Sequence, residues 1–172
     1  MCGIIGIVSR PSGRAVPTSA HVLEGLDEAL RSSRDGDVAR TADHVGQVDL
    51  LLRGDAGLAV LMDNRRLAVD VTTRLDELDA FALSSEAALE SASSLSVAEV
   101  ERRSLDLARL KDANWAIRND RLRNAVAVFD LAGTGATDSA RNAYFSIQQA
   151  FAALDRMEVR GRDSAEIGRA HV

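Results

Sequence analysis

The chain has 172 residues, of which 46% are hydrophobic and 3% aromatic, and its formal net charge is −5. The hydrophobic share is too high for a disordered chain, and the acidic balance gives no electrostatic footprint for nucleic acid or an anionic membrane. No apolar run approaches the roughly 20 residues that span a bilayer. One cysteine excludes an internal disulfide and fits a reducing cytoplasm. The three histidines lack metal-ligand spacing, so we expect no metal and no cofactor.

The first part of the chain predicts one short strand followed by helices. Residues 2–9 are mostly apolar, with two glycines and four β-branched residues, which favours a buried strand. Thr18 or Ser19 is expected to cap a helix that runs to about Arg31. A second helix is expected over residues 38–53, closed by the glycine that follows.

The central part of the chain predicts long helices. Residues 56–92 are expected to form two helices with a break near Asn64. The 75 residues from 58 to 132 contain neither proline nor glycine, the two main interrupters of helices. The predicted fold class is therefore mostly α, a long helical hairpin or bundle, with the single strand at the N-terminus.

A capping box predicts the start of the longest helix. Ser96 and Glu99 have the spacing at which each side chain satisfies the other's backbone amide. From there the helical pattern runs to Ala132, with Gly133 as its C-cap. We expect a loose hairpin rather than a strict coiled coil, because three polar residues interrupt the seam of Leu107, Leu110 and Ile117. These are Asn114, Arg121 and Asn124.

The last helix is expected to run from about Asp138 to Met157 and to end in a charged turn at Gly161. Its spacing predicts an inward apolar face. That face comprises Ala143, Ile147, Ala150, Phe151 and Leu154.

The N-terminus carries a possible nucleophile. Removal of Met1 would leave Cys2 with a thiol and a free α-amine on one residue. An α-amine has a pKa near 8, so it can act as general base toward the thiol without a separate histidine. Gly3 would let a substrate approach the backbone closely. The alternative is that Cys2 is a small apolar residue at the start of a buried strand.

A second motif lies near the C-terminal end. Residues 152–165 read Ala-Ala-Leu-Asp-Arg-Met-Glu-Val-Arg-Gly-Arg-Asp-Ser-Ala. Together with the Met-Cys-Gly-Ile start, this resembles the class II glutamine amidotransferases, and most closely the isomerising glutamine–fructose-6-phosphate aminotransferases. That family continues, after one helix, with Leu-x-Arg-Leu-Glu-Tyr-Arg-Gly-Tyr-Asp-Ser-Ala-Gly. The matching positions are Arg160, Gly161, Asp163, Ser164 and Ala165, whereas Met157, Val159 and Arg162 depart.

The resemblance implies a fold and a reaction. The parent fold is α+β, a four-layer αββα N-terminal-nucleophile hydrolase that is incomplete here. Cys2 would attack the side-chain amide of L-glutamine and release ammonia, which is passed to fructose 6-phosphate to make glucosamine 6-phosphate. Arg160 and Asp163 would support the pocket, although a structural ion pair is the favoured interpretation of Asp163. The family also implies a cytoplasmic homodimer.

The resemblance implies an insertion, because the family places one helix between its two motifs and this chain places roughly 130 residues there. We therefore assign residues 1–10 and 138–165 to the start of an amidotransferase domain, and residues 18–133 to a helical insertion in a surface loop. Residues 166–172 depart from the family. They can be encoded by the start of a common sequencing adapter, so we expect a non-native tail.

The chain is thus interpreted as an N-terminal fragment of the amidotransferase. It lacks the family's Arg-Trp-x-Thr-His glutamine clamp and its Asn-Gly oxyanion donors. Oxyanion donors contribute roughly 10²–10³ in rate, so we expect the chain as it stands to be inactive.

Three alternatives stay open. The chain resembles other class II amidotransferases at its Cys start, namely those of phosphoribosyl, asparagine and glutamate synthesis. A non-catalytic helical interaction module, with an incidental Cys2, belongs to another class. A phosphate loop at residues 133–135 is disfavoured, because Asp138 stands where the fingerprint needs glycine.

Overall fold

The computed structural model describes residues 13–62, 64–133 and 135–170, with side chains described as far as residue 154. About 85% of the described residues are helical, and no strand occurs among them. The mostly α prediction is therefore confirmed, whereas the predicted strand at residues 2–9 lies outside the described part. No described helix is long and apolar enough to cross a membrane.

The chain divides into two compact units. The first comprises residues 12–125, and the described residues from Val126 onward belong to the second. The first unit contains α1 (Ser19–Arg34), α2 (Val38–Leu51), α3 (Gly54–Met62), α4 (Arg65–Ser91), α5 (Val97–Ala116) and the π-helical segment η1 (Ile117–Leu122). Helix α6 (Arg123–Ala132) follows η1, and α7 (Asp138–Ala170) lies in the second unit.

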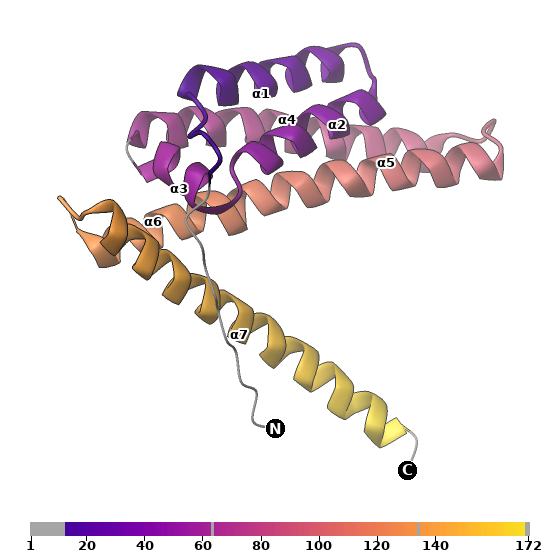
Figure 1. Ribbon diagram of the computed structural model, residues 1–172. Coiled ribbons are helices and arrows are strands. Elements are labelled where there is room, and N and C mark those ends of the chain that lie inside the picture. The colour runs from indigo at the N-terminus through magenta and orange to yellow at the C-terminus, as the bar shows by residue number, and fades with distance from the viewer. Residues whose placement is uncertain (1–12, 63, 134, 171–172) are drawn as a thin grey trace. The chain divides into compact units, whose positions relative to one another are not determined.

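The first unit is a four-helix bundle built from two helical hairpins, α1–α2 and α4–α5 (Figure 1). Helix α1 packs on α4, and α2 packs on α5. Their shared core consists of aliphatic side chains at helical spacing, which the low aromatic content requires. Fully buried members include Val22, Leu26, Val45, Val48, Leu67, Val71, Leu75, Leu78 and Leu110.

Predicted helix starts in this unit are confirmed. The Thr18 hydroxyl caps α1 by accepting from the His21 amide at 3.1 Å. The Asn64 side chain caps α4, which places the break between α3 and α4 where it was expected. At α5 both halves of the capping box are present, Ser96 with Glu99.

The first two helices end close to where they were predicted to end, with differences of two or three residues. Helix α1 runs to Arg34 and α2 ends at Leu51, within the usual fraying of helix termini. Gly133 ends α6 at φ 74°, and its amide bonds to the Phe129 carbonyl at 2.9 Å. Glycine is favoured there because the left-handed conformation strains other residues.

Gly57 has a different role from these caps, since it permits a close approach within the chain. A Cβ at this position would overlap the backbone of Leu52. Helix α3 can therefore fold back against the end of α2 only with glycine at this point.

The predicted regular helix over residues 97–132 is wrong in one respect. Six residues, Ile117–Leu122, form a π-helical turn between α5 and α6. The wider turn changes the helical phase, and polar residues just before it and within it, Asn114, Arg118 and Arg121, are held by partners on α2 and α4. Hydrophobic spacing alone does not reveal such a turn, because its origin is tertiary.

Two predictions for the last helix are wrong. Helix α7 does not end near Met157 but continues through Gly161 to Ala170, so the predicted turn is helical. A lone glycine costs a helix only about 1 kcal/mol relative to alanine, and no proline follows. The predicted inward face is exposed: Ile147 is 46% and Phe151 56% accessible. Amphipathic spacing identifies an apolar face but not whether another element covers it.

Candidate functional site

None of the predicted site residues can be assembled into a site from the described part of the chain. Cys2 and Gly3 lie outside it. The backbones of Arg160, Gly161 and Asp163 lie within α7, and their side chains also fall outside the described residues. The nucleophile and its pocket therefore remain predictions.

The first unit holds an interior polar network where the end of α2 meets η1. The Asp49 carboxylate is 3% exposed, and it accepts from Arg121 Nε at 2.9 Å and from Arg53 Nη2 at 2.6 Å. Two guanidiniums thus compensate one buried carboxylate, which satisfies the requirement for burying a charge.

A second set of polar contacts joins α5 and η1 to α4. Asn114 is 2% exposed and donates to the Leu75 carbonyl at 3.1 Å and to Asp79. Arg118 bridges the carboxylates of Asp76 at 2.6 Å and Asp79 at 2.9 Å. Of the three polar residues that interrupt the predicted seam, Asn114 and Arg121 bind neighbouring helices, whereas Asn124 donates to the Asp120 carbonyl one turn back. The network that joins the helices is therefore structural.

Surface ion pairs join the two hairpins. Arg74 Nε lies 2.7 Å from Asp27 Oδ1, and this hydrogen bond raises the pKa of the Arg74 guanidinium above its ordinary value. Arg109 bonds to Asp43, which likewise raises the pKa of Arg109. Both arginines keep their charge, so these pairs position helices and offer no acid–base chemistry.

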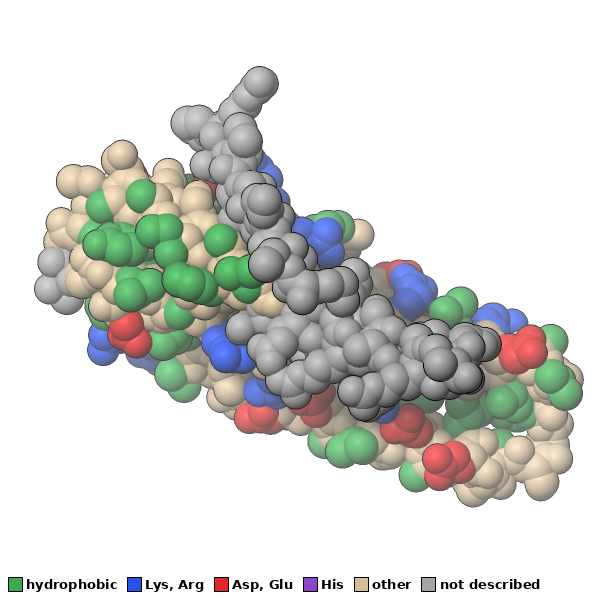
Figure 2. All heavy atoms as spheres, turned by 90° about the horizontal axis from the view of Figure 1, so that it is seen from below, with side chains coloured by type: hydrophobic (Ala, Val, Ile, Leu, Met, Phe, Trp, Pro, Cys, Tyr) green, Lys and Arg blue, Asp and Glu red, His purple; other side chains and the backbone are tan. Residues whose placement is uncertain are grey.

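The described residues contain no cluster of three or more His, Cys, Asp or Glu side chains that could hold a metal ion. Acidic and basic side chains alternate over the face of the molecule seen in Figure 2. Among the described residues on that face, neither sign of charge forms a continuous field.

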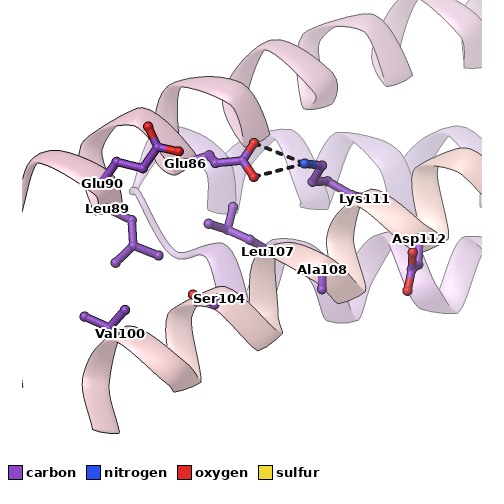
Figure 3. A pocket seen from close by; sticks show the side chains of 9 residues that line it. All are labelled: Glu86, Leu89, Glu90, Val100, Ser104, Leu107, Ala108, Lys111 and Asp112. Atoms are coloured by element: carbon purple, nitrogen blue, oxygen red, sulfur yellow. Dashed lines mark hydrogen bonds and ion pairs between the residues drawn. The ribbon is translucent and has the colours of Figure 1, made fainter. Parts of the chain in front are cut away.

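A groove of about 430 Å³ lies between α4 and α5 near the end of their hairpin. Leu89 of α4 and Val100 and Leu107 of α5 point toward one another across it (Figure 3). Glu86 and Lys111 close one end through an ion pair of 3.1 Å. The remaining lining residues are Glu90, Ser104, Ala108 and Asp112.

No motif in the sequence marks this groove. Glu86 and Glu90 are spaced four apart, so both belong to one face of α4, and Leu89 lies beside them. That pattern alone is typical of an ordinary solvated helix. The groove arises from the length of the α4–α5 hairpin, which extends beyond the end of α1–α2 (Figure 1).

Comparisons with known proteins add no relative. No protein-family model matches the chain, and no curated protein and no solved structure matches it either.

Proposed function

We propose that this chain carries the start of a class II glutamine amidotransferase, interrupted by the helical unit. The observation that carries the proposal is the pair of motifs in the sequence, Cys2-Gly3 at the start and Arg160-Gly161-x-Asp163 near the end. The favoured activity is glutamine hydrolysis coupled to amination of fructose 6-phosphate.

The Cys2 thiolate attacks the carbonyl carbon of the glutamine side-chain amide in this mechanism. The α-amine of Cys2 takes the thiol proton and returns it to the leaving nitrogen, which departs as ammonia. Water then attacks the resulting thioester, and glutamate leaves as the thiolate reforms. Each step uses one group as base and then as acid, so no metal or cofactor is needed.

The ends of the helical unit support its interpretation as an insertion. The Arg14 side chain, near the start of the unit, donates to the Leu50 carbonyl at 2.7 Å and the Leu51 carbonyl at 3.1 Å. Near the other end, Arg121 bonds to Asp49. The chain therefore enters and leaves the unit beside the same end of α2. Neighbouring termini are the geometry that domain insertion tolerates best.

The exposed stripe on α7 also supports the proposal. Ile147, Phe151 and Leu154 share one face of the helix and are between 42% and 56% accessible. The amidotransferase interpretation places residues 147–154 of α7 shortly before the second motif, where a sheet would cover their apolar face.

The gene itself provides the sharpest test. Independent amplification and sequencing beyond codon 165 should give glycine after Ser164-Ala165, and an Arg-Trp-x-Thr-His segment within some tens of codons. A frame that continues as Glu166-Ile167-Gly168 and contains no such segment would overturn the proposal.

A second test uses the chain of 172 residues. Intact mass should show loss of Met1, because methionine before a small residue is normally removed. Glutamate release from glutamine should be undetectable, since the oxyanion donors and the glutamine clamp are missing. Turnover that disappears in Cys2→Ala would contradict the expected inactivity.

A further inference from the structure

The tip of the α4–α5 hairpin differs from the rest of the bundle because α1 and α2 do not reach it. Helix α4 has 27 residues, whereas α1, which packs along it, has 16. At 1.5 Å per residue, this difference in length corresponds to about 16 Å of α4. The groove of Glu86, Leu89, Val100 and Leu107 lies in this extension.

The floor of the groove is apolar and its edges are acidic. Leu89, Val100, Leu107 and Ala108 supply the apolar surface. The edges carry three carboxylates, from Glu86, Glu90 and Asp112, against the single ammonium of Lys111. Since Lys111 pairs with Glu86, the carboxylates of Glu90 and Asp112 remain without an ion pair in the described structure.

Two exposed apolar side chains lie one helical turn from lining residues of the groove. Leu83 precedes Glu86 by one turn of α4, and Trp115 follows Asp112 by one turn of α5. They are 64% and 55% accessible. A partly exposed tryptophan is the type of side chain that anchors protein interfaces.

From this placement we propose that the groove docks an amphipathic helix of a partner protein, with an apolar face flanked by Lys and Arg. A helix fits because the groove runs between two helices, and helices pack into such grooves through residues at i, i+3, i+4 and i+7. The excess of carboxylates at the edges of the groove favours a partner with basic side chains. A second copy of this hairpin would instead bring like charges together, which costs free energy. The proposal is independent of the chemistry assigned to Cys2.

A designed peptide tests the proposal on the whole chain. The probe is a fluorescein-labelled helical peptide of about 14 residues, with leucine at i, i+3, i+4 and i+7 and lysine on both flanks. Fluorescence anisotropy should give a Kd on the order of 10 μM, and this Kd should rise as the salt concentration is increased. The same peptide with glutamate for lysine should bind at least about tenfold more weakly.

Charge reversal provides matched variants. The double variant Glu90→Lys with Asp112→Lys should bind the lysine peptide at least about tenfold more weakly, and it should bind the glutamate peptide more tightly than the native chain does. The control variant Glu24→Lys with Glu77→Lys changes the net charge by the same amount at exposed sites outside the groove. Its Kd for the lysine peptide should stay within about twofold of the native value. Circular dichroism checks that both variants are folded.

Three results would overturn the proposal. The first is no binding of the lysine peptide below about 1 mM, and the second is equal binding to both double variants. The third is a dimer in light scattering that dissociates on Glu90→Lys with Asp112→Lys, because a second copy would then be the occupant. Loss of peptide binding leaves the gene test for the amidotransferase unaffected, so the two proposals fail separately.

Discussion

The lower part of the α4–α5 hairpin, which α1 and α2 cover, and its tip around Leu89 and Val100 are built from the same two helices. They differ in what covers them. In the lower part, Leu75 and Leu78 are fully buried under α1 and α2. At the tip, Leu89 and Val100 continue the same helical spacing and stay partly exposed. The difference teaches that periodicity makes an apolar face, while the length of the neighbouring helices decides whether the face becomes core or surface.

The largest expected effect comes from truncating one leucine in each region. Leu75→Ala should lower the free energy of unfolding by about 3 kcal/mol, because it leaves a cavity in a packed core. Leu89→Ala should cost about 1 kcal/mol or less, since its side chain is only partly buried. Urea denaturation followed by circular dichroism measures both. Similar costs for the two variants would mean that the tip is covered as well as the lower part.

A smaller contrast is expected between the ion pairs of the two regions. Asp49→Asn should destabilise the bundle by about 2 kcal/mol, because Arg121 loses a charged partner in a buried network. Glu86→Gln removes the exposed pair with Lys111 and should cost about 0.5 kcal/mol or less. Raising the salt concentration should reduce the second cost more than the first. If the two variants unfold at the same urea concentration, the buried and exposed ion pairs contribute equally and the expected difference is wrong.

The cap of α5 should matter mainly at the tip. Ser96→Ala removes the side chain that accepts from the Glu99 amide, and caps contribute about 1 kcal/mol. Hydrogen exchange should speed up over residues 97–104 and stay unchanged over 67–78. Faster exchange across both segments would show that tip and core open as one cooperative unit.

The smallest expected effect is a pH dependence at the same cap. Hydrogen bonds from Ser96 lower the pKa of Glu99 below its ordinary value of 4.5. A depressed pKa means that the stabilisation is present above the unfolded value and is lost as the pH falls through the folded one. Protection of the α5 amides should therefore decrease below about pH 4.5 in the native chain and not in Glu99→Gln. An identical pH profile for the two chains would contradict this.

Local signals predicted the helices well. The Asn64 break, the Ser96–Glu99 box and the Gly133 cap all depend on residues within one turn of each other, so the sequence contains them in full. The π-helical turn could not be predicted, because Asn114, Arg118 and Arg121 are satisfied by residues 35 to 72 positions away. The end of α7 was missed because a single glycine is too weak an interrupter to stop a helix.

The candidate sites divide along the same line. The Cys2 and Arg160–Asp163 motifs were found from sequence patterns, and both remain predictions. The groove at the hairpin tip has no motif, because it results from unequal helix lengths. Single-sequence spacing cannot reveal a surface that exists only where a neighbour ends.

The contacts of Arg14 and Arg121 with the same end of α2 have a consequence for the connectivity of the chain. Because the bundle begins and ends at neighbouring points, its two ends can be joined by a short glycine-rich linker without stretching any helix. New termini can then be opened in the connection between α4 and α5, at residues 92–96. Such a circular permutant keeps the packing of the four helices, but α5 is then synthesised before α1 and α4 is synthesised last.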